Sequence, residues 1–282
     1  RATVHVRLRF LQVRRRSVQE RTADGFTPVD ELTVAGRRHL TFDEAVPREY
    51  DLSVPVAELG HAAHVAHIVA PGGEEVEPLG PTARLVRTRW PVPSVVRLSA
   101  ERADAPFPLL RLRLEVENTA DGPAIGAPRP EALRVSLIAT HTLLTVDGGT
   151  FLSLLDPPAW AAAAAKGCHN THTFPVLAGD PDRRDVLLSS PILMADHPRV
   201  SPESPGNLFD ATEIDEILSL RTRTLTDEEK REARATDPRA AAIIDRVDAT
   251  SNEVMARLHG AVRSLRPVAR NAEPAVQPAV QP

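Results

Sequence analysis

A two-residue alternation of apolar and polar side chains recurs through the first 120 residues, and no other feature limits the fold as strongly. The clearest run extends from Leu110 to Glu117, where leucine or valine alternates with arginine or glutamate. A period of two places successive side chains on opposite faces of a strand, so each such run has one dry and one wet face. The short apolar segments bounded by Gly, Pro, Asp or Asn are 4–13, 33–34, 50–56, 85–90, 95–98 and 110–116.

Strands of this length, without helical periods between them, are typical of an antiparallel sandwich or barrel. The class predicted for the whole chain is α+β, with an N-terminal antiparallel β-sandwich or barrel-like domain at 1–120. A mixed α/β connector at 121–200 and a C-terminal bundle of short helices at 201–268 are expected to follow.

The predicted connector combines helical and extended segments. Pro130 suits the first position of a helix, and the apolar spacing that continues to Leu144 predicts a helix over 130–144. The alanines at 161–165 favour a helical turn that ends at Gly167. The segments 174–177 and 186–194 are expected to form a β-hairpin.

The helical character of the last part is written in its capping signals. Asp210 with Glu213, and Thr226 with Glu229, match the capping box, in which two side chains satisfy the free amides of a first helical turn. Ile243, Ile244 and Val247 follow Asp237-Pro238 as an apolar stripe. The proline-rich segment 269–282 is predicted to be a disordered tail.

Composition excludes several classes of protein. The chain has 282 residues, 42% of them hydrophobic, and no apolar run approaches the roughly 20 residues that cross a bilayer. The formal charge of -4 and an aromatic content of 4% argue against nucleic-acid binding. A single cysteine excludes an internal disulfide. We therefore expect a cytoplasmic protein without a membrane span, although the start at Arg1 leaves room for a leader segment.

Common catalytic signatures are absent. The sequence contains no phosphate-binding GxxxxGK[ST] loop, no GxGxxG, no GxSxG elbow, no HExxH and no CxxC. The best remaining candidate is Cys168-His169-Asn170-Thr171-His172, because Cys168, His169 and His172 offer a thiolate and imidazoles that transition metals bind. Further ligands would come from His141 or His197. The alternative is a small, partly buried cysteine beside exposed histidines.

A second histidine group is His61, His64 and His67. On a helix these side chains spread too widely to converge on one ion, and on a strand His64 points opposite to the other two. Surface histidines are the better interpretation. Asp196-His197 forms a further candidate, a polarised imidazole, but adjacent residues rarely orient each other.

Charged clusters offer two more candidates. Asp210, Glu213, Asp215 and Glu216 are dense enough for an interaction site, a hard cation or acid-base chemistry. Carboxylates at a helix start are also favoured by the helix dipole, which is the simpler explanation. The run 14–16 is three arginines, suited either to an anionic partner or to the acidic helix starts of the chain itself.

The segment SPESPGNLFDATEIDEILSLRTRTLTDEEK at 201–230, together with the strand before it from 185, resembles a block of an uncharacterised family of actinobacterial proteins. That family carries no assigned activity, catalytic residue or cofactor. A fainter similarity is to accessory proteins of redox metalloenzyme systems such as hydrogenases.

Three hypotheses for function follow. The preferred one is a non-catalytic interaction or assembly protein with a protein partner, because catalytic signatures are missing while the architecture is strongly specified. The second is a metal-handling accessory factor that uses Cys168, His169 and His172 to bind a transition metal. The third is an enzyme of unrecognised type with a carboxylate and imidazole set, namely Asp196, His197, Asp210 and Asp215.

Overall fold

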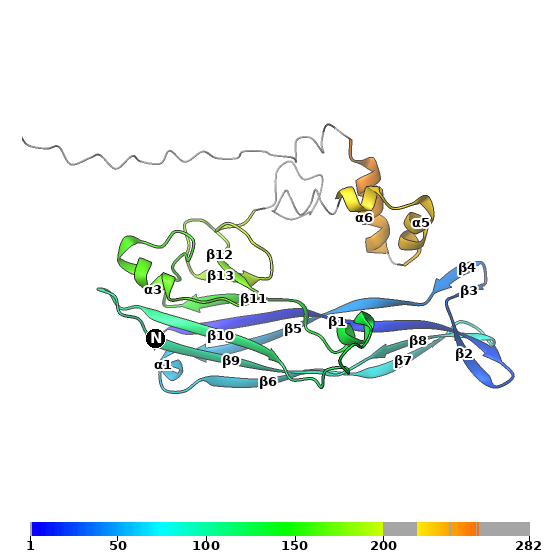
Figure 1. Cartoon of the computed structure of the whole chain (residues 1–282), viewed down its shortest axis with the longest axis horizontal. Helices are drawn as coiled ribbons and strands as arrows, with labels where there is room; N and C mark the ends of the chain where they lie inside the picture. The colour runs from blue at the N-terminus through cyan, green and yellow to red at the C-terminus, as the bar shows by residue number, and fades with distance from the viewer. Residues whose placement is uncertain (1, 200–218, 237, 252, 254–282) are drawn as a thin grey trace, which may run out of the picture.

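Strands dominate the computed structural model, which describes residues 2–199, 219–236, 238–251 and 253. The strands run along the long axis of the molecule (Figure 1). Their bounds are β1 Thr3–Thr22, β2 Gly25–Val29, β3 Glu31–Val34, β4 Arg37–Leu40, β5 Phe42–Pro55, β6 His64–Ala70, β7 Gly73–Pro78, β8 Ala83–Arg89, β9 Val92–Arg102, β10 Leu110–Asn118, β11 Ile138–Asp147, β12 Phe174–Leu177 and β13 Val186–Ser190. The short helices are α1 Val56–Leu59, α2 Arg129–Arg134, the 3-10 turn η1 Ala159–Ala161, α3 Ala162–Lys166, α5 Asp227–Thr236 and α6 Pro238–Ala249.

The strand β1 is the frame of the larger sheet. Along one edge it pairs first with β11, over residues 3–11, and then with β8, over residues 14–20. Along its other edge it pairs with β5 over residues 3–16 and with β2 over residues 18–22. β12, β13 and β7 extend this antiparallel sheet outward in the order β12-β13-β11-β1-β8-β7. The strand is therefore much longer than the segment 4–13 predicted from its alternation.

A second sheet, in the order β10-β9-β6, packs against β1 and β5. The alternation of apolar residues explains the packing, since the even-numbered side chains of β1 from Val4 to Phe10 are all buried. One cluster joins Val4 and Val6 to Leu98 of β9, and the other joins Leu8 and Phe10 to Ile68 of β6. The core therefore lies between the two sheets.

The chain crosses between these sheets at two neighbouring points. It leaves β6 for β7 at Pro71-Gly72, and it leaves β8 for β9 at Trp90-Pro91. The crossings lie so close that a Cβ on Gly72 would stand 2.7 Å from Cδ of Pro91, closer than carbon atoms tolerate. Only glycine fits at position 72 without a shift of the second crossing.

The helix predicted over 130–144 is wrong for most of its length. α2 ends at Arg134, and the residues from Ile138 onward form β11, which pairs with β1. β11 and β13 come from the segment predicted as a connector, and both continue the sheet that contains β1. The division of the chain into separate units remains a prediction.

Two other expectations for this segment are confirmed. β12 and β13 form the predicted antiparallel hairpin, although β13 ends at Ser190 rather than at residue 194. The alanine-rich helix α3 ends at Gly167, whose amide donates to the carbonyl of Ala164. Antiparallel sheets with a few short helices agree with the coarse class predicted from the sequence.

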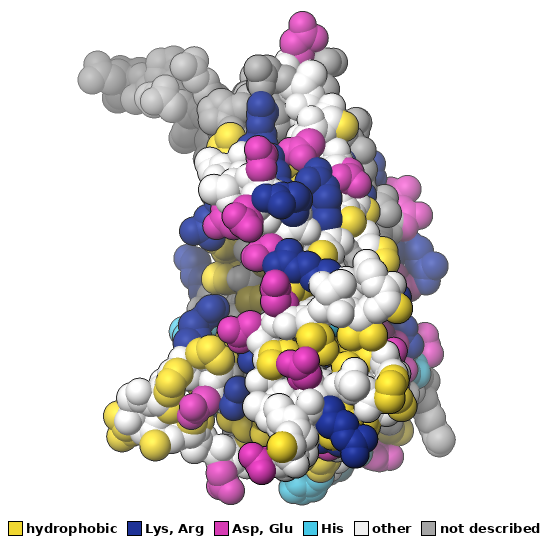
Figure 2. All heavy atoms as spheres, turned by 90° about the vertical axis from the view of Figure 1, so that its right-hand side faces the viewer, with side chains coloured by type: hydrophobic (Ala, Val, Ile, Leu, Met, Phe, Trp, Pro, Cys, Tyr) yellow, Lys and Arg dark blue, Asp and Glu magenta, His cyan; other side chains and the backbone are white. Residues whose placement is uncertain are grey.

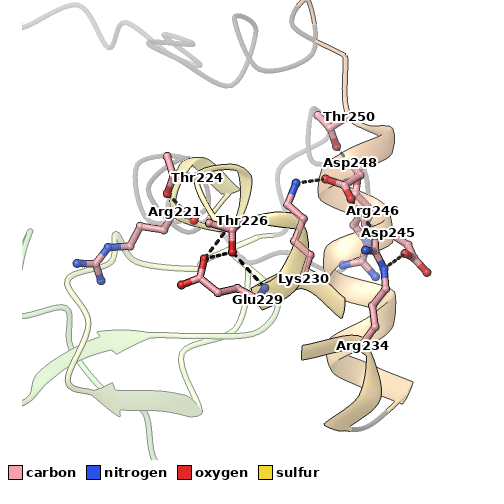
Figure 3. Close-up of polar contacts among 10 residues, drawn as sticks. All are labelled: Arg221, Thr224, Thr226, Glu229, Lys230, Arg234, Asp245, Arg246, Asp248 and Thr250. Carbon is pink, nitrogen blue, oxygen red and sulfur yellow. Dashed lines mark hydrogen bonds and ion pairs between the residues drawn. The ribbon is translucent and has the colours of Figure 1, made fainter. Parts of the chain in front are cut away.

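The helices α5 and α6 pack as a pair, and ion pairs join them (Figure 3). Lys230 and Arg234 on α5 both contact Asp248 on α6, each at 2.8 Å. These two cations lower the pKa of the Asp248 carboxyl. Ile244 and Val247 of the predicted stripe are buried. In the part of the chain that the structure describes, no helix is long and apolar enough to cross a membrane.

Candidate functional site

The surface of greatest interest is an aromatic pair that joins two loops. Phe107 lies in the loop between β9 and β10, and Trp160 lies in η1. Their ring centroids are 5.2 Å apart with the planes at 79°, the edge-to-face arrangement that aromatic quadrupoles favour. Both rings stay accessible, with 58% of Phe107 and 36% of Trp160 exposed. Leu110 and Leu155, close to them in sequence, are exposed as well.

Polar contacts hold the same two loops together. The amide of Ala103 donates to the carbonyl of Leu109 at 3.0 Å and closes the β9–β10 loop. Arg111, at the start of β10, donates to the carbonyl of Ala164 on α3 and pairs with Glu101 at 2.8 Å. The aromatic pair is therefore fixed from both sides rather than carried on a loose loop.

Cys168 lies next to this surface, but its predicted companions do not gather around it. The thiol is half-buried and donates to the carbonyl of Ala164 at 3.6 Å. Hydrogen bonds with Glu101 and with Cys168 raise the pKa of the Arg111 guanidinium. His169 and His172 are exposed. Among the described residues no three His, Cys, Asp or Glu side chains are grouped to hold a metal ion, so the metal site remains a hypothesis.

Asp196 and His197 tie a loop to β12. The carboxylate of Asp196 accepts hydrogen bonds from the amide of Leu177 at 2.8 Å and from the hydroxyl of Ser153 at 2.5 Å. The amide of His197 donates to the carbonyl of Leu177 at 2.7 Å. Both carboxylate oxygens of Asp196 are thus engaged in holding the loop. The other two members of the hypothetical enzyme set, Asp210 and Asp215, lie outside the described residues.

The acidic cluster Asp210, Glu213, Asp215 and Glu216 also lies outside the described residues, and so does the first capping box. The second box is present as predicted (Figure 3). The amide of Thr226 donates to Glu229 at 2.7 Å, and the amide of Glu229 donates to the Thr226 hydroxyl at 3.2 Å. The backbone hydrogen bond from Thr226, followed by that from its side chain, lowers the pKa of Glu229.

Replacing Thr226 by alanine is expected to loosen the start of α5 by about 1 kcal/mol, the usual cost of a lost cap. The pKa of Glu229 should then move toward its ordinary value, because one of its two donors is gone. A carboxyl whose pKa is lower in the folded than in the unfolded protein stabilises the fold at pH values above its unfolded pKa. This contribution disappears as the pH falls through its folded pKa. NMR titration of Glu229 and amide exchange in α5 measure both effects. An unchanged titration would contradict the role of the box.

The arginines at 14–16 contact side chains of β5. Arg14 and Arg15 pair with Glu44 and Asp43, and the guanidinium of Arg16 lies 5.1 Å from the ring centroid of Phe42. Burial lowers the pKa of Arg16. The acidic partners that the structure describes for Arg14 and Arg15 are therefore on the neighbouring strand β5.

Charges of both signs are mixed at the end of the molecule that carries β2, β3 and β4 (Figure 2). Ion pairs join Arg38 to Glu31 and Arg87 to Glu77. An open hollow of about 490 Å³ is present near this end, lined by Arg15, Ser17, Pro28, Val29, Asp30 and Thr41. Of the residues predicted to bind metal or act catalytically, those that the structure describes do not line it.

His61, His64 and His67 are exposed, as expected for surface histidines. His64 and His67 are on β6 and His61 precedes it. Comparison with protein-family models, with curated protein sequences and with solved structures finds no match to this chain. The resemblance of 185–230 to an actinobacterial family therefore stays a prediction.

Proposed function

We propose that this chain is a non-catalytic interaction or assembly protein that binds a protein partner through the surface around Phe107 and Trp160. The exposed edge-to-face pair of these two rings carries the proposal. Aromatic side chains make up only 4% of the chain, and two of these large apolar rings are exposed together on one surface. Exposed apolar surface of this kind is typical of interaction sites. Tryptophan is also among the residues that dominate binding energy at interfaces.

The way the pair is held supports the same function. Binding is weakened whenever loops must be ordered at the interface, and a surface that is already fixed avoids that cost. The Arg111 contact with α3 and the closed β9–β10 loop fix Phe107 and Trp160 relative to each other. In the architecture that accompanies the proposal, a sandwich-like N-terminal domain contributes Phe107 to this surface and the following segment contributes Trp160.

A photoreactive benzophenone analogue in place of Phe107, in the full chain within its own cells, should give a discrete covalent adduct with one partner. Trp160→Ala should then lower the affinity for that partner by at least about tenfold. Truncating a tryptophan that anchors an interface typically weakens binding by about 2 kcal/mol or more. Mass spectrometry of the adduct and a binding titration are the measurements.

The matched control is the same analogue in place of Val76, an equally exposed apolar residue on β7, which is 50% exposed. Adducts of similar pattern from both positions would show non-specific contact. The absence of any adduct from position 107, together with isolation of the chain alone at native abundance, would refute the proposed function.

Binding of a transition metal by Cys168, His169 and His172 remains the alternative proposal. This alternative has a metal ion as the ligand instead of a protein partner. Both candidate sites lie near the start of β10.

A further inference from the structure

The strand β6 lies at one edge of the three-stranded sheet and runs along the lower margin of the molecule (Figure 1). It pairs with β9 on one side, from His64 opposite Leu98 to Ala70 opposite Val92. Within the described part of the chain, no strand pairs with its other side. A row of backbone N–H and C=O groups on such an edge is a template for another strand.

The register shows which backbone groups face this open edge. The amide of Thr119 donates to the carbonyl of Pro93 at 3.0 Å, so odd-numbered residues of β9 bond toward β10. Even-numbered residues of β9 therefore bond toward β6, where Val96 is opposite Ala66 and Ser94 is opposite Ile68. The backbone N–H and C=O groups of Val65, His67 and Val69 must then point to the open edge.

One contact agrees with this assignment. The hydroxyl of Tyr50, from β5, donates to the carbonyl of Val69 at 3.2 Å. That carbonyl is thus directed away from β9, as the register requires. It keeps a second lone pair for another donor.

The side chains of the same three residues are open to solvent. Val65 is 46% exposed and Val69 is 55% exposed, and His67 lies between them. All three are on the outer face of the sheet, because Ile68 and Ala70 on the inner face are buried in the core. β6 therefore presents a strip of two exposed valines and a histidine, beside backbone groups that no described strand pairs.

Every other edge strand of the described sheets carries a device that blocks pairing. Proteins protect exposed edges with charged side chains or proline. β7 has three glutamates, β10 carries two arginines and two glutamates, β5 has acidic residues, and β2 and β12 contain proline. In the two-stranded sheet, β3 has a glutamate and β4 has two arginines. β6, with the sequence HVAHIVA, has no acidic residue, lysine, arginine or proline. The missing protection indicates an edge that is covered in the working protein.

We propose that β6 pairs with β6 of a second copy of this chain, antiparallel and centred on His67. The exposed strip is symmetric about His67, since Val65 and Val69 lie two residues to either side. A two-fold axis at His67 places each Val65 opposite the Val69 of the second copy, with both apolar side chains on one face. The open backbone groups of the two strands then satisfy each other.

Self-complementarity favours a second copy over an unrelated extended peptide. The strip meets its own copy without opposing any acidic residue, lysine or arginine, and its two valines supply both halves of each cross-strand pair. This dimer is independent of the surface around Phe107 and Trp160, which lies on other strands and loops.

Charge reversal across the proposed axis tests the pairing. Val65→Glu with Val69→Glu places like charges opposite each other twice, and should turn a dimer into a monomer in analytical ultracentrifugation. Val65→Lys with Val69→Glu places opposite charges there, and should keep the dimer. Val76→Glu, on the exposed face of β7, is the control that should leave the dimer unchanged.

A cross-link tests the position of the axis in nearly native protein. In a Cys168→Ser background, His67→Cys brings two thiols to the two-fold axis, where paired Cα atoms stand about 5.5 Å apart, within disulfide range. Mild oxidation should yield a covalent dimer from this variant, and none from Val76→Cys. A wild-type chain that stays monomeric at all concentrations would overturn the proposal. A dimer that survives Val65→Glu with Val69→Glu, or that gives no cross-link at position 67, would overturn it equally.

Discussion

Replacing Phe10 by alanine is expected to lower the free energy of unfolding by about 3–5 kcal/mol, the usual range for removing a buried aromatic ring. Phe10 is 2% exposed and belongs to the cluster that joins β1 to β6 and β9. Its ring stacks on Tyr50, with centroids 5.9 Å apart. The cavity would therefore open between the two sheets, where close packing limits how far neighbouring side chains can move to fill it.

Phe107→Ala is the matched control, because it removes the same ring from an exposed loop. Its effect on stability should stay within about 1 kcal/mol, since little of the ring is taken out of water on folding. Chemical denaturation of both variants measures the difference. Equal losses would mean that the core does not lie between β1 and the β10-β9-β6 sheet.

Burial of one face leaves a period of two, and this pattern predicted at least part of β1, β5, β9 and β10. It did not predict β6 or β11, although Ile68, Ala70 and Leu144 of these strands belong to the core. The prediction for β1 stopped at Val13, since Arg14 to Arg16 break the alternation. The structure continues the strand to Thr22 because β8 and β2 supply hydrogen-bond partners on both edges. Local pattern cannot reveal the pairing with β8, which is distant from this part of β1 in the sequence.

The error over 130–144 has a related cause. Leu137, Ile138, His141 and Leu144 satisfy helical spacing, but the segment 137–146 also carries the β-branched residues Thr140, Thr142, Thr145 and Val146. Such residues favour strands when a sheet offers an edge to join. The open edge of β1 over residues 3–11 offers that place, and pairing overrides the helical spacing.

The aromatic pair could not be predicted from the sequence. Phe107 and Trp160 lie in loops rich in proline or alanine, without any period. Their contact depends on how α3 lies against the start of β10, which only the fold specifies. The capping box at Thr226 is the opposite case, because its contacts span three residues and the spacing alone defines them.

The burial of Gln12 follows from the sequence pattern of β1, but its hydrogen-bond partners do not. The second large effect on the free energy of unfolding is expected at this residue. Continuing the alternation of β1 places position 12 on the dry face, where a polar side chain needs partners. Gln12 is fully buried, and its side-chain amide nitrogen donates to the backbone carbonyls of Trp90, at 2.6 Å, and Pro71, at 3.2 Å. Its carbonyl accepts from Arg48 at 2.8 Å. One side chain thus fastens both points at which the chain crosses between the sheets.

Gln12→Leu keeps the volume but leaves two backbone carbonyls without donors, and we expect a loss of about 2–4 kcal/mol in the free energy of unfolding. The control is Gln19→Leu on the same strand. Gln19 is half-buried and accepts a hydrogen bond from Arg84 at 2.7 Å, so water can replace its partner. Its loss should stay below about 1 kcal/mol.

Amide hydrogen exchange separates this role from general packing. If Gln12 fastens the crossings, exchange in Gln12→Leu should accelerate first at Gly72, Gly73 and Trp90, while the centre of the β9–β10 pairing keeps its protection. Uniform acceleration throughout both sheets would mean that Gln12 supports the whole fold rather than the two crossings in particular. Equal losses for the two leucine variants would show that water reaches position 12, and that the crossings are held by Gly72 and its close approach to Pro91 instead.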